Sequence, residues 1–219
     1  YKSTDKSILV LMEKINSSDP SVSLSWANYL VESGIFYRET GELEEALHNL
    51  EISEKIIEKS MPYSPDMARI YAEYGIIYRL QNKLNKSKKY FDKAFQLVDP
   101  LKMDSHPLVA IYAVEFAKLY EQIGKNKQAI EKLSRVTNAQ IERRNLLRRE
   151  ISTGLKTEQF IIKEAFVKEI DLLKKSNDSS IFERTFLLSQ AAKHIEASEA
   201  LNSFALRNKL GNSQLSELL

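Results

Sequence analysis

The nine residues SGIFYRETG at positions 33–41 have a counterpart 41 residues further along the chain, YGIIYRLQN at positions 74–82. Four of the nine positions are identical. A third copy, FAKLYEQIG at positions 116–124, follows after a further 42 residues. Several columns thus keep both their spacing and their residue type, which amphipathic helices would not do by chance. The sequence indicates an internal repeat.

The first part of the repeat combines a small residue, a tyrosine and a Gly or Asn. These columns are Gly34, Gly75 and Ala117; Tyr37, Tyr78 and Tyr120; and Gly41, Asn82 and Gly124. A small side chain lets two helices approach closely, and a tyrosine on the same face fills the space between them. Gly and Asn tolerate the left-handed backbone conformation that ends a helix. This part predicts a first helix and its stop.

The second part of the repeat predicts a second helix that packs on the first. It carries small residues at Ala46, Ser87 and Ala129 and large apolar residues at Leu50, Phe91 and Leu133. All five prolines fall between the expected helices, and Pro65 and Pro107 stand at or just before a helix start, where the missing N–H costs nothing. The period is therefore helix–turn–helix.

These residues resemble the tetratricopeptide (TPR) repeat, whose usual period is about 34 residues. The longer period here, 41–42, resembles the repeats of kinesin light chains and of bacterial multi-repeat proteins. The resemblance implies an all-α, TPR-like solenoid, a right-handed superhelix with a helical C-terminal extension. We expect a partial preceding helix in residues 1–19, around Ile8–Ile15. Three repeats are expected in residues 20–137 and the extension in residues 138–219, which could link to a downstream domain.

Members of this family are non-catalytic scaffolds that bind an extended peptide or a partner helix in a concave groove lined by the first helices. The resemblance places these residues in the groove: Asn28, Val31, Ile35, Arg38, Arg69, Ala72, Ile76, Arg79, Val114, Lys118 and Glu121. Arg38 and Arg79 are equivalent and lie above the apolar pair Ile35 and Ile76. This combination favours a peptide with an apolar anchor and an acidic group. The alternative is that both arginines are solvated or paired with local acids such as Glu39.

Two other features of the repeat region have simpler interpretations. Chaperone-binding TPRs carry Lys and Asn where this chain has Val31, Ile35, Ala72 and Ile76, so capture of a chaperone C-terminus is not expected. An aromatic stripe, which helical spacing assigns to core packing, consists of Tyr71, Tyr74, Tyr78, Phe116 and Tyr120.

The extension carries a weaker resemblance. Phe160–Leu173 is an amphipathic helix, and Ser180 with Glu183 forms a capping box for the next one. The string that follows is similar to the helical segment before the protease domain of bacterial TPR–CHAT proteins, which are caspase-like peptidases. It consists of Phe186, Gln190, Ala200, Leu201, Ala205, Arg207, Gly211, Leu215 and Leu218. In this alternative function the chain is the regulatory arm of a protease whose catalytic His and Cys lie downstream.

A second alternative is weak nucleic-acid binding through Arg143, Arg144, Arg148 and Arg149. On a helix these four spread over more than half of the circumference, and Glu142 and Glu150 flank them. A mixed solvated surface is the competing interpretation. The net charge of +2, from 32 basic and 30 acidic side chains, makes the chain an improbable dedicated nucleic-acid binder.

Composition excludes several kinds of chemistry. With 6 glycines and 5 prolines among 219 residues, the chain has too few turn-formers for an all-β sandwich. It has no cysteine, so it holds no disulfide, thiol nucleophile or thiolate metal site. Phosphate-loop and zinc-helix motifs are absent, and His48, His106 and His194 lie far apart. We expect no enzyme activity, no metal and no cofactor.

The ends of the sequence and its hydropathy bear on context. The chain begins with Tyr1, and we expect it to be a piece of a longer protein. No apolar run approaches the length of a membrane span, so a soluble chain with a protein partner is expected. The compartment stays open with the cytoplasm as default, and the oligomeric state stays open too.

Overall fold

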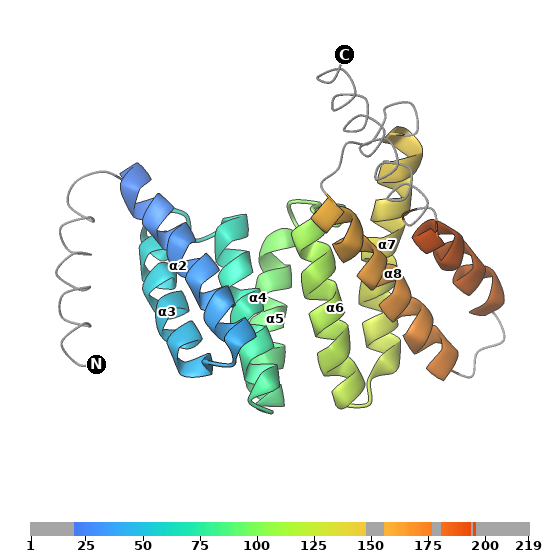
Figure 1. Cartoon of the computed structure of the whole chain (residues 1–219), viewed down its shortest axis with the longest axis horizontal. Coiled ribbons are helices and arrows are strands. Elements are labelled where there is room, and N and C mark those ends of the chain that lie inside the picture. The colour runs from blue at the N-terminus through green and yellow to red at the C-terminus, as the bar shows by residue number, and fades with distance from the viewer. Residues whose placement is uncertain (1–19, 148–155, 177–180, 194, 196–219) are drawn as a thin grey trace, which may run out of the picture. The chain divides into compact units, whose positions relative to one another are not determined.

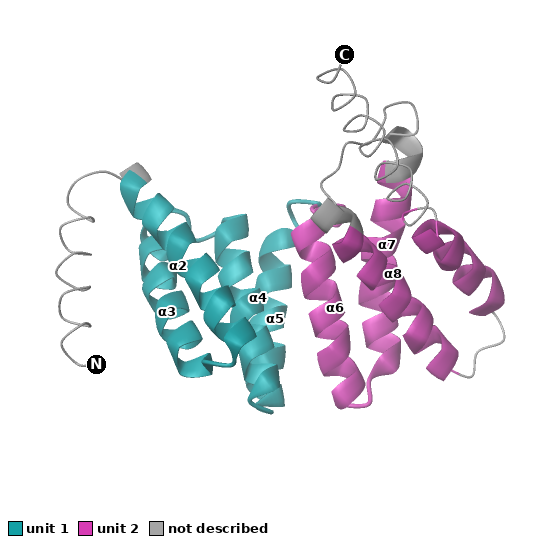
Figure 2. Cartoon of the chain, in the orientation of Figure 1, with its two compact units in different colours: residues 1–102 teal, residues 103–219 magenta. Residues whose placement is uncertain are grey.

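The structure is a computed structural model that describes residues 20–147, 156–176, 181–193 and 195. Every regular element in these ranges is a helix. The chain forms two compact units, residues 1–102 and residues 103–219 (Figure 2). The all-α class predicted from the sequence is therefore observed.

The described part of unit 1 consists of two helical hairpins. The first pairs α2 (Pro20–Thr40) with α3 (Leu43–Ser60), and the second pairs α4 (Pro65–Leu80) with α5 (Leu84–Val98). The partners of each hairpin lie side by side, and α4 also packs against α3 (Figure 1). The core of the unit is apolar and combines Leu30, Leu50, Ile57, Ile70 and Ile77.

Unit 2 contains the third hairpin and the start of the extension. Helices α6 (Pro107–Gln122) and α7 (Asn126–Leu147) form the hairpin, and α8 (Lys156–Lys175) packs against both of them (Figure 1). Residues 181–193 form a further helix. Its Leu188 and Ala192 share an apolar core with Phe166 and Leu173 of α8. The apolar face predicted for Phe160–Leu173 is thus buried in this core.

The three hairpins reverse direction with the same backbone motif. Gly41, Asn82 and Gly124 have φ values of 90°, 58° and 71°, which is the predicted left-handed conformation. The next N–H in each copy donates to the tyrosine carbonyl five residues earlier: Glu42 to Tyr37 at 2.8 Å, Lys83 to Tyr78 at 2.8 Å and Lys125 to Tyr120 at 2.7 Å. This is the Schellman arrangement, which satisfies carbonyls at the end of the first helix.

The predicted close approach within a hairpin is tightest in the second one. A Cβ atom placed on Gly75 would lie 2.8 Å from the ring of Phe91, and one on Gly34 would lie 3.2 Å from Leu50. In the third hairpin Ala117 and Leu133 occupy these positions, and both are fully buried. The largest residue of this column, Phe91, thus faces a glycine, whereas Leu133 leaves room for an alanine.

The first helices of the second and third hairpins begin as predicted, with proline in the first turn. The hydroxyl of Ser64 accepts a hydrogen bond from the N–H of Met67 before Pro65. Nδ1 of His106 accepts one from the N–H of Leu108 across Pro107. His106, expected to be a residue near a helix start, is therefore a helix cap.

A buried ion pair fastens the helix at 181–193 to its neighbours. Glu169 of α8 is fully buried, and both of its carboxylate oxygens accept hydrogen bonds from Arg184, at 2.8 and 3.1 Å. Ser134 and Thr137 of α7 donate to the same carboxylate, at 2.6 and 2.5 Å. The complete set of donors offsets the cost of burying the charge.

Several predicted features lie outside the described residues. The predicted boundary between the repeats and the extension, at residue 137, lies within α7, where Gln140 and Ile141 also pack, and it stays a prediction. The described part of the chain does not include residues 1–19 with Ile8–Ile15, nor Ser180 and His194, nor residues 196–219 with most of the TPR–CHAT-like string.

The hairpin contact predicts the effect of one added methyl group. Gly75→Ala forces the ring of Phe91 to move, so we expect a loss of about 1–3 kcal/mol in the free energy of unfolding. The double variant Gly75→Ala with Phe91→Leu copies the Ala117–Leu133 pair and should recover most of the loss. Urea denaturation of both variants, with Phe91→Leu as the control, measures this. A double variant no more stable than Gly75→Ala would contradict the packing argument.

Candidate functional site

The structure buries four of the residues predicted to line a groove. Val31, Ala72, Ile76 and Val114 are at most 2% exposed. They belong to the apolar interior of their units and offer no side-chain surface to a partner. Asn28 is exposed, whereas Ile35 and Arg79 are half-buried.

Arg38 and Arg69, predicted to face a ligand, form ion pairs between α2 and α4. Nε of Arg38 donates to Oε2 of Glu73 at 2.8 Å, and Nη2 of Arg69 donates to Oε1 of Glu32 at 2.6 Å. Arg38 also lies 3.5 Å from Glu39, the partner named in the sequence-based alternative. The two arginines are therefore held by local acids, and the pairs bridge the first helices of successive hairpins.

The two ion pairs differ in their contact with solvent. The Glu73 side chain is 5% exposed, whereas the Glu32 side chain is 63% exposed. A carboxylate as buried as that of Glu73 depends on its cation, while an exposed one is stabilised by water. The two arginine side chains are equally shielded, at 18% exposure, so the pairs differ in the carboxylate: that of Glu73 is buried and that of Glu32 faces solvent.

The sequence prediction of groove residues did not include Glu32 and Glu73, although the sequence carries a signal for them. The two acids are separated by the repeat spacing of 41, and Glu115 follows after a further 42 residues. Glu32 and Glu73 pair with an arginine of the neighbouring first helix, whereas Glu115 pairs with Lys118 of its own helix. We define the α2–α4 surface by Asn28, Glu32, Ile35 and Arg38 of α2 with Arg69, Glu73 and Arg79 of α4.

In unit 2 the predicted groove residues Lys118 and Glu121 contact α8. Lys118 donates to Glu115 at 2.6 Å and to Glu164 at 3.3 Å. Glu121 accepts from Lys168 at 2.6 Å and from Lys175 at 2.7 Å, and these bonds lower the pKa of its carboxyl group. As in unit 1, where ion pairs join α2 to α4, ion pairs here join the first helix of a hairpin to the first helix after that hairpin.

The predicted aromatic stripe is buried in part. Tyr74, Phe116 and Tyr120 are at most 6% exposed, but Tyr71 and Tyr78 are half-buried. In unit 1 the rings of Tyr71 and Tyr90 lie beneath the ammonium of Lys93, at 4.7 and 5.3 Å. The sequence assigned this stripe to the core, and at Tyr71 and Tyr78 it also forms a cation–π surface.

Glu54 of α3 lies beside this tyrosine layer. The hydroxyl of Tyr74 donates to its carboxylate at 2.9 Å. Burial raises the pKa of Glu54, and the hydrogen bond from Tyr74 opposes the increase. Burial and the nearby Glu54 carboxylate raise the pKa of Tyr74 as well. The hydrogen bond between Tyr74 and Glu54 is thus a structural contact between α4 and α3.

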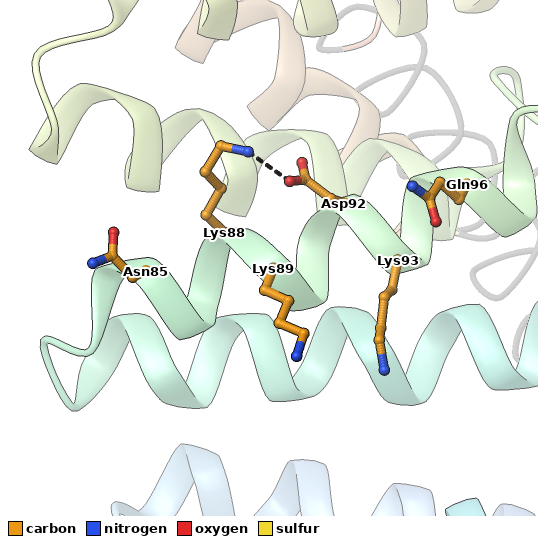
Figure 3. Close-up of a pocket in the computed structure, with 6 residues that line it drawn as sticks. All are labelled: Asn85, Lys88, Lys89, Asp92, Lys93 and Gln96. Atoms are coloured by element: carbon orange, nitrogen blue, oxygen red, sulfur yellow. Dashed lines mark hydrogen bonds and ion pairs between the residues drawn. The ribbon is translucent and has the colours of Figure 1, made fainter.

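A hollow lies along α5 and is lined by Asn85, Lys88, Lys89, Asp92, Lys93 and Gln96. Figure 3 shows Lys89 and Lys93 extending to one side of the helix, while Lys88 turns to Asp92 at 2.6 Å. All six residues come from one helix, so no second element converges on a ligand there. The hollow does not have the form of an enclosed small-molecule site.

Other chemistry finds little support in the described ranges. They contain no group of three or more His, Asp or Glu side chains arranged to hold a metal ion. None of their helices is long and apolar enough to cross a membrane. Nη1 of Arg143 donates to the carbonyl of Ser105 at 3.1 Å. The side chains of Arg144, Arg148 and Arg149 lie outside the part that the structure describes.

Comparisons with known proteins agree with this architecture. Residues 66–142 match the family model described as tetratricopeptide repeat. The match starts in α4 and ends in α7, and so covers the second and third hairpins. A comparison with curated proteins gives no match.

The chain also resembles a solved structure. The crystal structure of BtubC (BKLC) from P. vanneervenii superposes with a TM-score of 0.65 and 17% sequence identity, over 91% of this chain and 73% of that one. At this identity the likeness concerns the fold alone. Together with the repeat match, it shows an all-α, TPR-like fold; repeats of this type generally mediate protein–protein interactions.

The difference between the two arginines yields a stability prediction. Arg38→Ala removes the ion-pair partner of a buried carboxylate, and we expect a loss of about 3 kcal/mol in the free energy of unfolding. Arg69→Ala leaves a carboxylate that water can solvate and should therefore cost less than Arg38→Ala. Urea denaturation of the two variants measures the difference. Equal losses would show that the burial of Glu73 does not set the value of its ion pair.

The ion pairs of Glu121 predict a dependence on pH. Its lowered pKa means that these pairs contribute stability above the unfolded pKa of about 4.3 and lose it as the pH falls through the lower folded value. Glu121→Gln should be less stable than the parent at pH 7, and the difference should shrink toward about pH 3. Thermal unfolding across this range measures it, with Glu131→Gln on the exposed face of α7 as control. A difference that does not change with pH would contradict the assignment.

Proposed function

We propose that the chain is a non-catalytic protein-binding module that holds an extended segment of a partner on the α2–α4 surface. The TPR-like fold supports this proposal, because repeats of this kind are typically scaffolds for protein partners. The observation that carries the choice of surface is the solvent-facing pair of Arg69 with Glu32. The Arg69 side chain is 18% exposed, and the exposed carboxylate of Glu32 covers it on a first helix, where members of the family bind their partners.

The proposed partner carries an acidic group beside an apolar anchor. A guanidinium binds a carboxylate through two parallel hydrogen bonds, so Arg69 is suited to the acidic group. The half-buried Ile35 supplies apolar contact for the anchor. Arg38 keeps its pair with Glu73 in the bound state, because displacing a buried carboxylate costs more than the new contact returns.

In this proposal Glu32 competes with the partner for Arg69. Its side chain is 63% exposed, so releasing it to water costs little. An acidic group of the partner then takes its place, and the preformed surface limits the entropy lost on binding. Removing Glu32 and removing Arg69 should therefore change the affinity in opposite directions.

The alternatives from the sequence stay predictions. The TPR–CHAT-like string lies mostly outside the described residues, and of its members only Phe186 and Gln190 are described, both exposed. For nucleic-acid binding, Arg143 is the one arginine of its cluster with a described side chain, and it bonds to the Ser105 carbonyl. Neither alternative has a described site that favours it.

The opposite effects of Glu32 and Arg69 give the test. Random peptides displayed on phage are selected against the full chain, and the best binder is measured by titration calorimetry. We expect selected peptides with Asp or Glu near an apolar residue. Arg69→Ala should weaken binding about tenfold, and Glu32→Ala should strengthen it several-fold.

A matched control uses another exposed ion pair. Lys88 and Asp92 lie 2.6 Å apart on α5, with side chains 41% and 42% exposed. Lys88→Ala should leave the dissociation constant unchanged. Selected peptides without acidic residues, or an affinity that Arg69→Ala does not change, would overturn the proposal.

A further inference from the structure

One face of α2 carries large apolar side chains that its neighbours leave exposed. Tyr29 and Phe36 are 59% and 61% exposed, and Val22, one helical heptad before Tyr29, is 47% exposed. Trp26 lies in the same stripe, with its ring stacked on that of Tyr29 at 5.1 Å. We call these four residues the α2 stripe. Glu32 borders the stripe, three residues after Tyr29 and four before Phe36, whereas Asn28 and Ile35 lie further round the helix.

The repeat shows what this face does elsewhere in unit 1. A shift of 41 residues carries Trp26, Tyr29 and Phe36 onto three residues of α4: Met67, Ile70 and Ile77. Each of these is at most 1% exposed, in a core shared with Ile52 and Ile56 of α3. The second helix of the preceding hairpin therefore packs against this face of α4.

A polar atom of the stripe also lacks a partner. The indole Nε1 of Trp26 is closed off from solvent, yet it donates no hydrogen bond to any residue that the structure describes. A buried donor without an acceptor costs about 1–3 kcal/mol. A segment lying over the stripe can supply the acceptor.

We propose that the α2 stripe is covered by residues 5–15 of the same chain, folded as the second helix of a preceding hairpin. Apolar residues recur there at Ile8, Leu11, Met12 and Ile15, the spacing of one face of a helix. The connection has a suitable length. Four residues, 16–19, precede Pro20, just as four residues, 61–64, join α3 to Pro65 of α4.

The occupant is this segment rather than a second copy of the chain. A segment joined by a short linker acts at an effective concentration in the millimolar range, which a separate molecule does not reach at ordinary protein concentrations. Its docking repeats the α3–α4 contact already present in the unit. This inference does not rest on the proposed function, because it concerns the apolar residues of α2 and not the ion pair of Arg69 with Glu32.

The chain supplies its own reporter for this contact. Trp26 is the single tryptophan of the sequence, so tryptophan fluorescence reads the α2 stripe alone. The full chain with Leu11→Asp and Ile15→Asp should show a red-shifted emission. Its acrylamide quenching constant should rise about twofold or more, because charged residues on the apolar face release the segment and admit water.

A matched variant separates release of the segment from a general effect of added charge. Val10→Asp places the same charge on the opposite side of the segment and should leave the emission and quenching of Trp26 unchanged. Circular dichroism checks that the helices of both units persist in each variant.

Two results would overturn the proposal. The first is an equal quenching constant in the parent and in the Leu11→Asp, Ile15→Asp variant. The second is quenching that falls as protein concentration rises, together with a dimer in light scattering. That result would assign the stripe to a second copy of the chain.

Discussion

The close approach of the two helices in each hairpin is the constraint on which the other features depend. Gly75 meets the ring of Phe91 at a distance that admits no Cβ atom without movement, and Gly34 meets Leu50 almost as closely. This contact fixes the distance between the partners. It also sets their axial position, which brings the Schellman turn at Gly41, Asn82 and Gly124 to the same place in every copy.

Much of this could be predicted from the sequence because each column has a local cause. Each hairpin requires a left-handed residue at its turn, a proline in a first turn and a small residue opposite a large one. These requirements are local, so they can be read from the sequence of a single repeat. The resemblance to TPR repeats followed from the same columns. Helix α7 continues to Leu147, past residue 137, and its length depends on packing that a single repeat does not show.

The candidate surface was less predictable because it depends on contacts between hairpins. The pattern placed Arg38 and Arg69 on the right helices but could not show which acids face them across 35 and 37 residues. It also assigned Val31 and Ala72 to an open groove, whereas the neighbouring helices bury them. Which side of a first helix stays open is decided by its neighbours, and these neighbours are remote in sequence.

The lateral ion pairs bear on how such a chain grows by duplication. Glu73 pairs with Arg38 of the hairpin before it, and Arg38 and Arg79 share one column. Glu32, the partner of Arg69, shares a column with Glu73. The second repeat thus carries both halves of each bridge. Tandem copies of it would present Arg79 to a new Glu73, and Glu73 to a new Arg69. Duplication of the second repeat would therefore supply both ion pairs between neighbouring copies. The first repeat has Asn28 in the column of Arg69, so its duplication would supply only one of the two ion pairs.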